Sequence, residues 1–316
     1  INDSFGHDTG DKFLLHISVI MSKLLDEAYT LGRLGGDEFI IIAPDIGDPK
    51  TLEDMAAKLV VAVSRTHIFN TLRLDSGVSV GLALASDCNY ELSSLITNAD
   101  VAMYKAKGSG KARFMWFNEE MLADTKRKVL ISTRLSSALE NDAFYLAYQA
   151  KVDAEQNIIG FETLLRWHDD VLGHVSPAEF IPIAEESGII SDIGYWVVYE
   201  AIRQNKIWHN AGILLQVAVN VSALQYEDPF FVERIRQTLL HHNMEAKYLI
   251  IEITESVMQN AEQSNRVIKE LHDLGVQVAI DDFGTGYSSL SVLNNVFIDI
   301  VKIDKSFIDG IMTKVN

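Results

Sequence analysis

From Phe144 onward, short apolar runs alternate with amphipathic helical patterns, and this alternation limits the possible folds more than any other feature of the chain. The apolar runs have the length of β-strands, and the segments between them carry apolar residues at helical spacing. Regular strand–helix alternation over this length favours a (β/α) barrel. The expected strands cover residues 144–152, 158–167, 215–221, 248–254, 277–281 and 300–303, and the expected helices cover residues 177–187, 193–211, 229–241 and 261–274.

The strongest chemical signal lies in residues 278–287, where an apolar strand leads into two adjacent carboxylates, Asp281 and Asp282, and then into a glycine-rich turn. Unpaired carboxylates at the end of a buried strand are costly to desolvate, so they usually indicate a nearby cation. Two neighbouring aspartates also suit a pair of metal ions, one side chain bridging and the other terminal, as phosphodiester cleavage by paired ions requires. Taken alone, the dipeptide is more often part of a solvated loop.

Polar residues near the ends of other expected strands favour the functional interpretation. Each of these residues, taken alone, could be a structural polar group. Asn220, for example, could serve in a turn or a helix cap, where asparagine is common. Several carboxylates, an amide and a lysine on successive strands are hard to explain as packing, because the strand ends of a barrel are where catalytic residues collect. Oxygen ligands suit Mg²⁺ or Mn²⁺ rather than structural zinc. The set comprises Glu162, Arg166, Asn220, Glu252, Asp281, Asp282 and Lys302.

The first segment has another order, with a helix, a hairpin, a helix, a strand, a helix and a strand, which predicts an α/β sandwich. Gly35 and Gly36 followed by Asp37 and Glu38 form the expected hairpin tip. A double glycine suits a tight turn with positive φ and lets a ligand approach the backbone. Alone, such a tip is more often a turn with a solvated acid pair. The helices are expected at residues 11–27, 49–66 and 91–107, and the strands at residues 29–33, 39–43, 77–84 and 113–117.

Composition limits the binding partners and the cell compartment that the chain is expected to have. The 316 residues carry a formal net charge of −17, which disfavours nonspecific binding to nucleic acid polymers or anionic membranes. Cys88 is the only cysteine, which excludes an intrachain disulfide and fits the cytoplasm. No apolar run is long enough to span a bilayer. We expect one domain at residues 1–118, a connecting helical segment without Pro or Gly at 119–140, and a second domain at 141–316.

Motifs in the second domain resemble the EAL family of cyclic di-GMP phosphodiesterases. They lie at residues 160–167, 220–222, 252–255, 281–286 and 301–304. The resemblance runs from about residue 126 to the end of the chain, and Thr163 stands where the family's defining tripeptide has alanine. It implies a (β/α)8 TIM-type barrel that hydrolyses cyclic di-GMP to linear pGpG with Mg²⁺ or Mn²⁺.

The EAL resemblance also implies residue roles. Asp281 would bridge two metal ions, the second of them held also by Asp282. Lys302 would orient or activate the attacking water, and Arg166 would bind a substrate phosphate as a bidentate donor. Glu255 would tether the loop that follows the two aspartates. The first metal would be held by Glu162, Asn220, Glu252 and Asp281.

Motifs at residues 1–11, 33–39 and 102–111 resemble the GGDEF family of diguanylate cyclases. The resemblance implies a partial nucleotide-cyclase-like α/β sandwich that binds GTP. Acids that bring Mg²⁺ to phosphates and lysines that offset the remaining charge suit this chemistry. By the resemblance, Asn2 and Asp11 read the guanine edge, Gly35 and Gly36 lie against the phosphates, Asp37 and Glu38 face the metal, and Lys107 and Lys111 hold the triphosphate.

Both resemblances extend past the ends of the chain, so we expect a fragment of a longer protein that an upstream segment could anchor to a membrane. An initial GGDEF strand would precede Ile1, and two barrel strands with a further metal-binding glutamate would follow Asn316. With open strand edges, the isolated fragment is expected to be poorly soluble and inactive. Two alternatives to a phosphodiesterase remain open: a signalling module that binds cyclic di-GMP or GTP without turnover, and a net diguanylate cyclase. A homodimer is also open.

Overall fold

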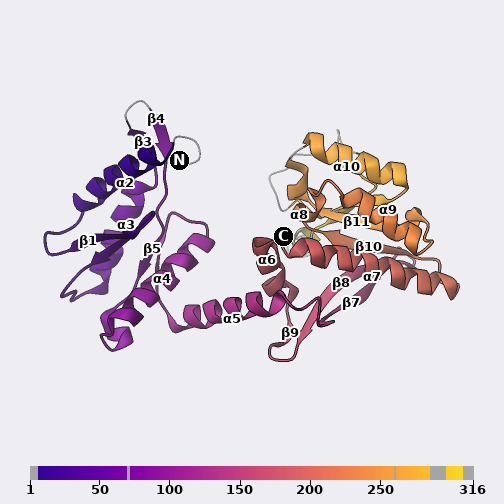
Figure 1. Ribbon diagram of the computed structural model, residues 1–316, viewed down its shortest axis with the longest axis horizontal. Helices are drawn as coiled ribbons and strands as arrows, with labels where there is room; N and C mark the ends of the chain where they lie inside the picture. The colour runs from indigo at the N-terminus through magenta and orange to yellow at the C-terminus, as the bar shows by residue number, and fades with distance from the viewer. Residues whose placement is uncertain (1–5, 70–71, 260, 285–296, 309–316) are drawn as a thin grey trace, which may run out of the picture. The chain divides into compact units, whose positions relative to one another are not determined.

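The computed structural model describes residues 6–69, 72–259, 261–284 and 297–308. The chain divides into two compact units, Ile1–Arg127 and Lys128–Asn316. Helix α5 (Glu119–Leu135) continues from the first unit into the second (Figure 1). Within the described part of the chain, no helix combines the length and the apolar character that a membrane crossing requires.

The first unit combines helices with paired strands, as the expected α/β class requires. Strands β1 and β2 form an antiparallel hairpin, β3 and β4 form another, and β5 pairs in parallel with β6. The β3–β4 hairpin was not expected from the sequence pattern. The elements are α2 (His7–Ser22), β1 (Thr30–Gly35), β2 (Glu38–Ile42), α3 (Pro49–Val63), β3 (Thr66–Phe69), β4 (Leu72–Asp75), β5 (Val80–Leu82), η1 (Ala85–Cys88), α4 (Leu92–Gly108) and β6 (Phe114–Trp116).

Helices α2 and α3 supply much of the core of this unit. Phe13, Ile17 and Met21 repeat every four residues on one face of α2, and they pack in one cluster with Leu59 and Val63 of α3. The helix expected to extend to residue 27 ends at Ser22, directly after the last buried residue of that face. Helix α3 begins as its sequence predicts, with Asp48 accepting a hydrogen bond from the Lys50 amide and Pro49 at the first helical position.

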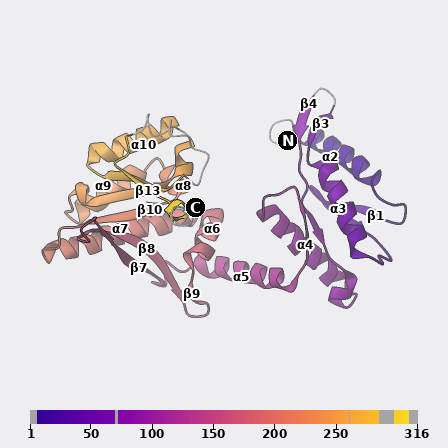
Figure 2. The same cartoon turned by 180° about the vertical axis from the view of Figure 1, so that it is seen from behind.

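The second unit is built on a sheet with the strand order β13-β12-β11-β10-β8-β7. Strands β8 and β10 to β13 are parallel, whereas β7 and β9 pair antiparallel with β8. Among the described residues the edges of this sheet are β7 and β13, both labelled in Figure 2, and β13 pairs with β12. The strands are β7 (Phe144–Val152), β8 (Ile158–Asp169), β9 (Gly173–Val175), β10 (Gln216–Val221), β11 (Leu249–Thr254), β12 (Gln277–Phe283) and β13 (Ile300–Ile303).

Helices cover one face of this sheet. Helix α7 packs against β10 and α9, and α10 packs against β12 and α9 (Figure 1). Side chains of alternate strand residues therefore point to different surroundings. One set faces the helices, and the other set faces the opposite side of the sheet. The helices are α6 (Pro177–Ser187), α7 (Ile190–Asn210), α8 (Ala223–Tyr226), α9 (Phe231–His241) and α10 (Ala261–Leu274), with short turns η2 (Ala246–Tyr248) and η3 (Glu255–Gln259).

The start of the sheet corrects the expectation of regular strand–helix alternation. Strands β7 and β8 are joined by a tight turn, in which Asp153 and Asn157 exchange hydrogen bonds of 3.0 and 2.8 Å. Parallel strands need a crossover of a dozen or more residues, which this connection lacks, so the pair must be antiparallel. The other expected strands were placed correctly to within two residues at either end.

Two layers of apolar residues hold the sheet. The helix-covered face carries large β-branched residues, each of which stabilises the fold by roughly 1.5–3 kcal/mol on full burial. The opposite face carries a separate buried cluster that includes two alanines. The first layer includes Val217, Val219, Ile251, Val278 and Ile280. The second layer consists of Ala218, Ile250 and Ala279, with Ile300 packed against them.

Candidate metal centre at the carboxyl ends of the strands

Strand register brings polar residues of neighbouring strands close to one another near the carboxyl ends of the strands. Asn220 on β10 is level with Glu252 on β11, and Ala218, two residues earlier on β10, is level with Glu162 on β8. Asp281 on β12 follows the partner of Glu252 by two residues. Side chains alternate along a strand, so the acids lie on the same face as Ala218, Ile250 and Ala279. They lie beyond this cluster, toward the carboxyl ends of the strands.

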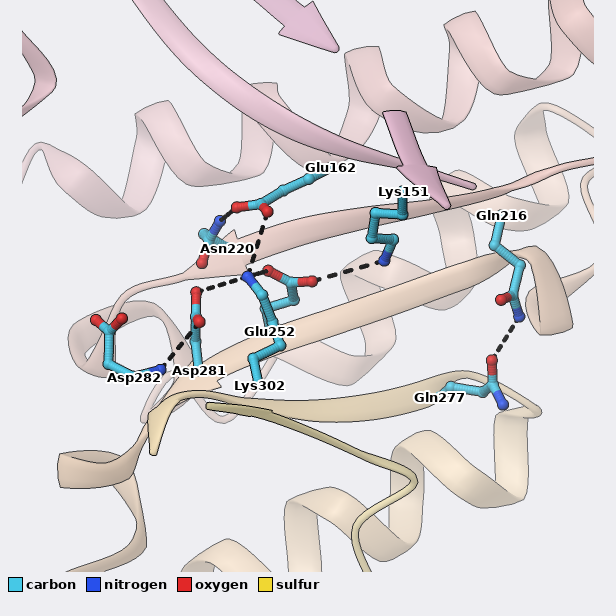
Figure 3. A network of polar contacts seen from close by, with 9 residues as sticks. All are labelled: Lys151, Glu162, Gln216, Asn220, Glu252, Gln277, Asp281, Asp282 and Lys302. Carbon is cyan, nitrogen blue, oxygen red and sulfur yellow. Dashed lines mark hydrogen bonds and ion pairs between the residues drawn. The ribbon is translucent and has the colours of Figure 1, made fainter. Parts of the chain in front are cut away.

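The ammonium group of Lys302 lies at the centre of three carboxylates (Figure 3). Its Nζ donates to Glu252 Oε2 at 2.6 Å, to Asp281 Oδ2 at 2.8 Å and to Glu162 Oε2 at 3.3 Å. Asn220 joins the group, because its Nδ2 donates to Glu162 Oε1 at 3.1 Å. A single ammonium cannot balance three carboxylates, so the centre remains acidic.

Burial differs among these groups. The Glu252 side chain is 1% exposed, whereas that of Lys302 is 26% exposed. Burial raises the pKa of the Glu252 carboxyl, although Lys302 opposes this effect. Burial alone would lower the pKa of Lys302, but its hydrogen bonds to Asp281 and Glu252 outweigh that effect and hold its pKa above the ordinary value. The Lys302 side chain therefore keeps its positive charge within the acidic centre.

The donor set fits a hard divalent cation. Oxygens of Glu162, Glu252 and Asp281 all lie within 4.8 Å of one another and could hold a metal ion. Oε1 of Glu252 is buried, and no hydrogen-bond donor reaches it in the described part of the chain. Oxygen-only ligands with spare charge are those that Mg²⁺-like ions prefer. The ammonium of Lys302 occupies the position where such an ion would be bound.

Asp282 lies beside this centre rather than within it (Figure 3). Its φ of 52° is in the left-handed region, which costs a non-glycine residue roughly 1–3 kcal/mol. Its amide donates to Asp281 Oδ1 at 2.9 Å. Partial burial and the nearby charges of Asp281 and Asp304 raise the pKa of the Asp282 carboxyl. A second cation bound between the two aspartates would relieve this repulsion.

Glu255 and Arg166 lie outside the carboxylate cluster. Glu255 is 7% exposed, and its Oε2 accepts a hydrogen bond of 3.0 Å from the amide of Gly284, whose φ is 102°. Glu255 thus fixes the start of the loop after Asp282; residues 285–296 of that loop lie outside the described residues. Arg166 extends from the same face of β8 as Glu162, and its Nη1 donates to the Leu165 carbonyl at 2.9 Å.

Lys151 is a member of this centre that the sequence analysis missed. It extends from β7 toward the acids, and its Nζ lies 3.7 Å from Glu252 Oε1 (Figure 3). Burial lowers the pKa of Lys151, while Glu252 opposes that shift. Alternation along β7 could have drawn attention to it, but only the antiparallel pairing of β7 with β8 brings it to the acids.

The hairpin tip of the first unit has the expected turn. Gly36 and Asp37 connect β1 to β2, and Gly36 has a φ of 51°, as the first position of a tight hairpin turn can require. A Cβ atom on Gly35 or Gly36 would meet nothing within 4 Å, so the backbone here is open to a ligand. Asp37 and Glu38 are both exposed.

Arg33 organises this tip, although the sequence analysis did not select it. Its Nε and Nη2 donate to the Gly36 carbonyl at 2.9 and 2.7 Å, and Nη2 lies 3.5 Å from Asp11 Oδ1. Lys107 at the end of α4 and Lys111 in the following turn are exposed, and no recorded contact of the described residues joins them to the hairpin. Asn2 lies outside the described residues.

A mostly parallel sheet with an acidic centre at its carboxyl ends defines the class of α/β barrel-type proteins that collect functional groups at the strand ends. The chain belongs to the EAL domain family, whose model matches residues 132–316. The model described as "Diguanylate cyclase, GGDEF domain" matches residues 1–113. These matches confirm both family resemblances and the expected fold class.

Similar proteins carry the same pair of regions. The cyclic di-GMP phosphodiesterase PdeR of Escherichia coli is 36% identical over 312 residues, covering 98% of this chain and 47% of that protein. The bifunctional diguanylate cyclase/cyclic di-GMP phosphodiesterase MucR of Pseudomonas aeruginosa is 37% identical over 312 residues, covering 98% of this chain and 45% of that protein. The chain therefore spans less than half the length of these relatives.

Solved structures resemble the second unit. One titled "PaMucR Phosphodiesterase, c-di-GMP complex" matches with a TM-score of 0.57 and 40% identity, covering 58% of this chain and 76% of that one. The cAMP- and cyclic di-GMP-bound form of the EAL enzyme Bd1971 matches with a TM-score of 0.57 and 28% identity, covering 60% of this chain and 53% of that one.

Proposed function

We propose that the second unit, within its full-length protein, hydrolyses cyclic di-GMP to linear pGpG. The observation that carries this proposal is the position of the Lys302 ammonium among the carboxylates of Glu162, Glu252 and Asp281, an arrangement at the strand ends that suits a cation. The names of PdeR and MucR and the ligand of the solved MucR structure support the choice of substrate.

The metal in this proposal is Mg²⁺ or Mn²⁺. Bound ions would supply positive charge to the phosphoryl oxygens and a lowered pKa for a water molecule. Asp281 is suited to bridge two ions for two reasons. The Asp281 carboxylate belongs to the clustered oxygens, and Asp282 follows directly in the chain. The residues assigned to the first ion are Glu162, Asn220, Glu252 and Asp281, and those assigned to the second are Asp281 and Asp282.

The remaining side chains position the reactants. Lys302 would leave the carboxylates on binding of an ion, and its ammonium would then orient the attacking water. Arg166 offers a planar, permanently charged donor for a substrate phosphate. Glu255 holds the Gly284 amide and thereby fixes the loop that follows Asp282. Charge balance thus comes from the ions and Lys302, and orientation comes from Arg166 and Glu255.

The first unit is proposed to bind GTP as a regulatory or cyclase partner. Asn2 and Asp11 are assigned to guanine, Gly35 and Gly36 to the phosphates, Asp37 and Glu38 to the metal, and Lys107 and Lys111 to the triphosphate. The open backbone at the hairpin tip supports this assignment. A cytoplasmic location fits nucleotide substrates and a single cysteine. Whether the full-length protein forms a homodimer is to be measured by light scattering.

Separate incubations of the full-length protein with cyclic di-GMP and with GTP, each with Mg²⁺ or with EDTA, test the proposal. We expect pGpG to appear only from cyclic di-GMP and only with Mg²⁺, as followed by chromatography. Cyclic di-GMP binding without turnover would favour the non-catalytic signalling module. Net formation of cyclic di-GMP from GTP would favour the diguanylate cyclase.

A further inference from the structure

The two carboxylate oxygens of Glu252 have different partners. Oε2 accepts a hydrogen bond from Lys302 at 2.6 Å, whereas Oε1 faces Lys151 at 3.7 Å and receives no hydrogen bond within the described residues (Figure 3). A separation of 3.7 Å is too long for a hydrogen bond, so Lys151 acts on Oε1 through its charge. Glu252 therefore lies between two ammonium groups from opposite edges of the sheet.

The Lys151 side chain extends beside a glycine of the neighbouring strand. Lys151 is level with Gly160 on β8, which is buried. A Cβ atom on Gly160 would lie 3.5 Å from Lys151 Cε and only 2.9 Å from the backbone oxygen of Gln216. A larger residue at this position would clash with the backbone of the neighbouring strand, whereas its contact with the Lys151 stem would be ordinary. Gly160 thus allows the close approach of β8 and β10 beside which Lys151 extends toward Glu252.

A buried carboxylate with an unpaired oxygen is costly and prone to rotate toward other partners. Lys151 lowers this cost on the Oε1 side, while Oε2 stays directed at the position that Lys302 occupies. We propose that Lys151 is a positioning residue of the metal centre, whose ammonium holds Oε1 of Glu252 and thereby directs Oε2 toward the bound divalent cation. This inference rests on the proposed metal-dependent function of the centre.

Repulsion between Lys151 and the cation acts in the opposite direction. The cation would bind beside Oε2, whereas Lys151 faces Oε1, so we expect the orienting effect to exceed the repulsion. Partners that orient metal ligands typically change metal affinity by about 10- to 100-fold. Loss of the Lys151 charge should therefore weaken metal binding rather than strengthen it.

Mn²⁺ binding to the full-length protein without substrate, measured by calorimetry, tests the proposal. We expect Lys151→Met to raise the Kd for Mn²⁺ about tenfold and Lys151→Arg, which keeps the charge, to stay within about threefold of wild type. Saturating Mn²⁺ should restore most of the phosphodiesterase kcat of Lys151→Met. The matched control is Lys247→Met, which removes an exposed lysine paired with Glu245 at 2.6 Å and should leave the Kd unchanged.

A wild-type Kd in Lys151→Met, or tighter binding, would overturn the inference and leave the proposed function intact. If Lys151→Met does not fold, Lys151→Arg decides, because a Kd more than tenfold above wild type despite the retained charge would also overturn it. Absence of Mn²⁺ binding by the wild-type protein would overturn the proposed metal centre itself, and the inference with it.

Discussion

Lys302 donates a hydrogen bond of 2.6 Å to Glu252, a residue 50 positions earlier in the chain. The pair spans the sheet from β13 to β11 and passes over β12, which lies between them. Because the same ammonium also contacts Asp281 at 2.8 Å, it occupies the oxygens that a metal ion would use. In the proposed function, Lys302 and a metal ion would therefore compete for one site, and this competition would have measurable consequences.

Replacement of Lys302 by methionine should separate metal binding from catalysis. We expect Lys302→Met to lose at least about a hundredfold in kcat, as loss of a group that acts in the transition state does. Its affinity for Mn²⁺ should equal or exceed that of wild type, because no ammonium competes. Calorimetry and a pGpG assay measure the two effects, and a parallel loss of Mn²⁺ affinity would contradict the competition.

Removal of metal should leave the fold intact. In EDTA the wild-type protein should lose hydrolysis but melt cooperatively, since Lys302 still offsets part of the charge of the three carboxylates. Lys302→Met in EDTA should melt at a lower temperature, because like charges are then left unpaired. Mg²⁺ should raise its melting temperature more than that of wild type. Equal melting temperatures in EDTA would show that Lys302 does not stabilise the centre.

Asp281→Asn should abolish hydrolysis, since it would remove the charge that is proposed to bridge both ions. We expect a loss of about a thousandfold or more, equivalent to about 4 kcal/mol of activation free energy. Binding of cyclic di-GMP in Ca²⁺ should fall less steeply. Asp273→Asn is the control, because Asp273 is exposed, lies outside the metal centre and forms an ion pair with Lys269 at 2.8 Å. Near-normal turnover in Asp281→Asn would refute the two-metal assignment.

Asp169 should make the stability of the second unit depend on acid pH. Burial alone would raise the pKa of Asp169, but Arg134 at 2.5 Å and the amides of Val171 and Leu172 at 2.9 Å lower it overall. A carboxyl group whose pKa is lowered in the folded state stabilises the folded state at pH values above its unfolded pKa of about 3.9. This stabilisation is lost as the pH falls through the folded pKa.

Asp169→Asn should therefore lower the free energy of unfolding at pH 7 by on the order of 2 kcal/mol, discounted because Arg134 is partly exposed. The difference from wild type should shrink as the pH falls below about 4. Urea unfolding at pH 7 and pH 3 measures both effects. An equal difference at the two pH values would show that the Asp169 charge is not responsible.

GTP should alter the phosphodiesterase rate of the full-length protein. Linkage requires GTP to bind two states of the protein unequally, and α5, which continues from one unit into the other, could carry that difference. Rates at several cyclic di-GMP concentrations, with and without saturating GTP, measure the effect. An unchanged rate and an unchanged substrate dependence would exclude this coupling.

The sequence alone determined the local elements and the chemical character of the second unit. Strand period and helical spacing placed β7 and β13 with their observed bounds, because both signals depend only on residues close together in the chain. The adjacent pair Asp281–Asp282 and the single acids Glu162 and Glu252 indicated a cation site, since isolated acids near buried strands are costly.

Only the tertiary structure decided which groups meet. The turn between Asp153 and Asn157 makes β7 antiparallel, and that pairing is what brings Lys151 within 3.7 Å of Glu252. The left-handed backbone of Asp282 likewise holds it beside the carboxylate cluster, although it adjoins Asp281 in sequence. Both features depend on strand register and on contacts between residues far apart in the chain, which periodicity and local turn chemistry do not encode.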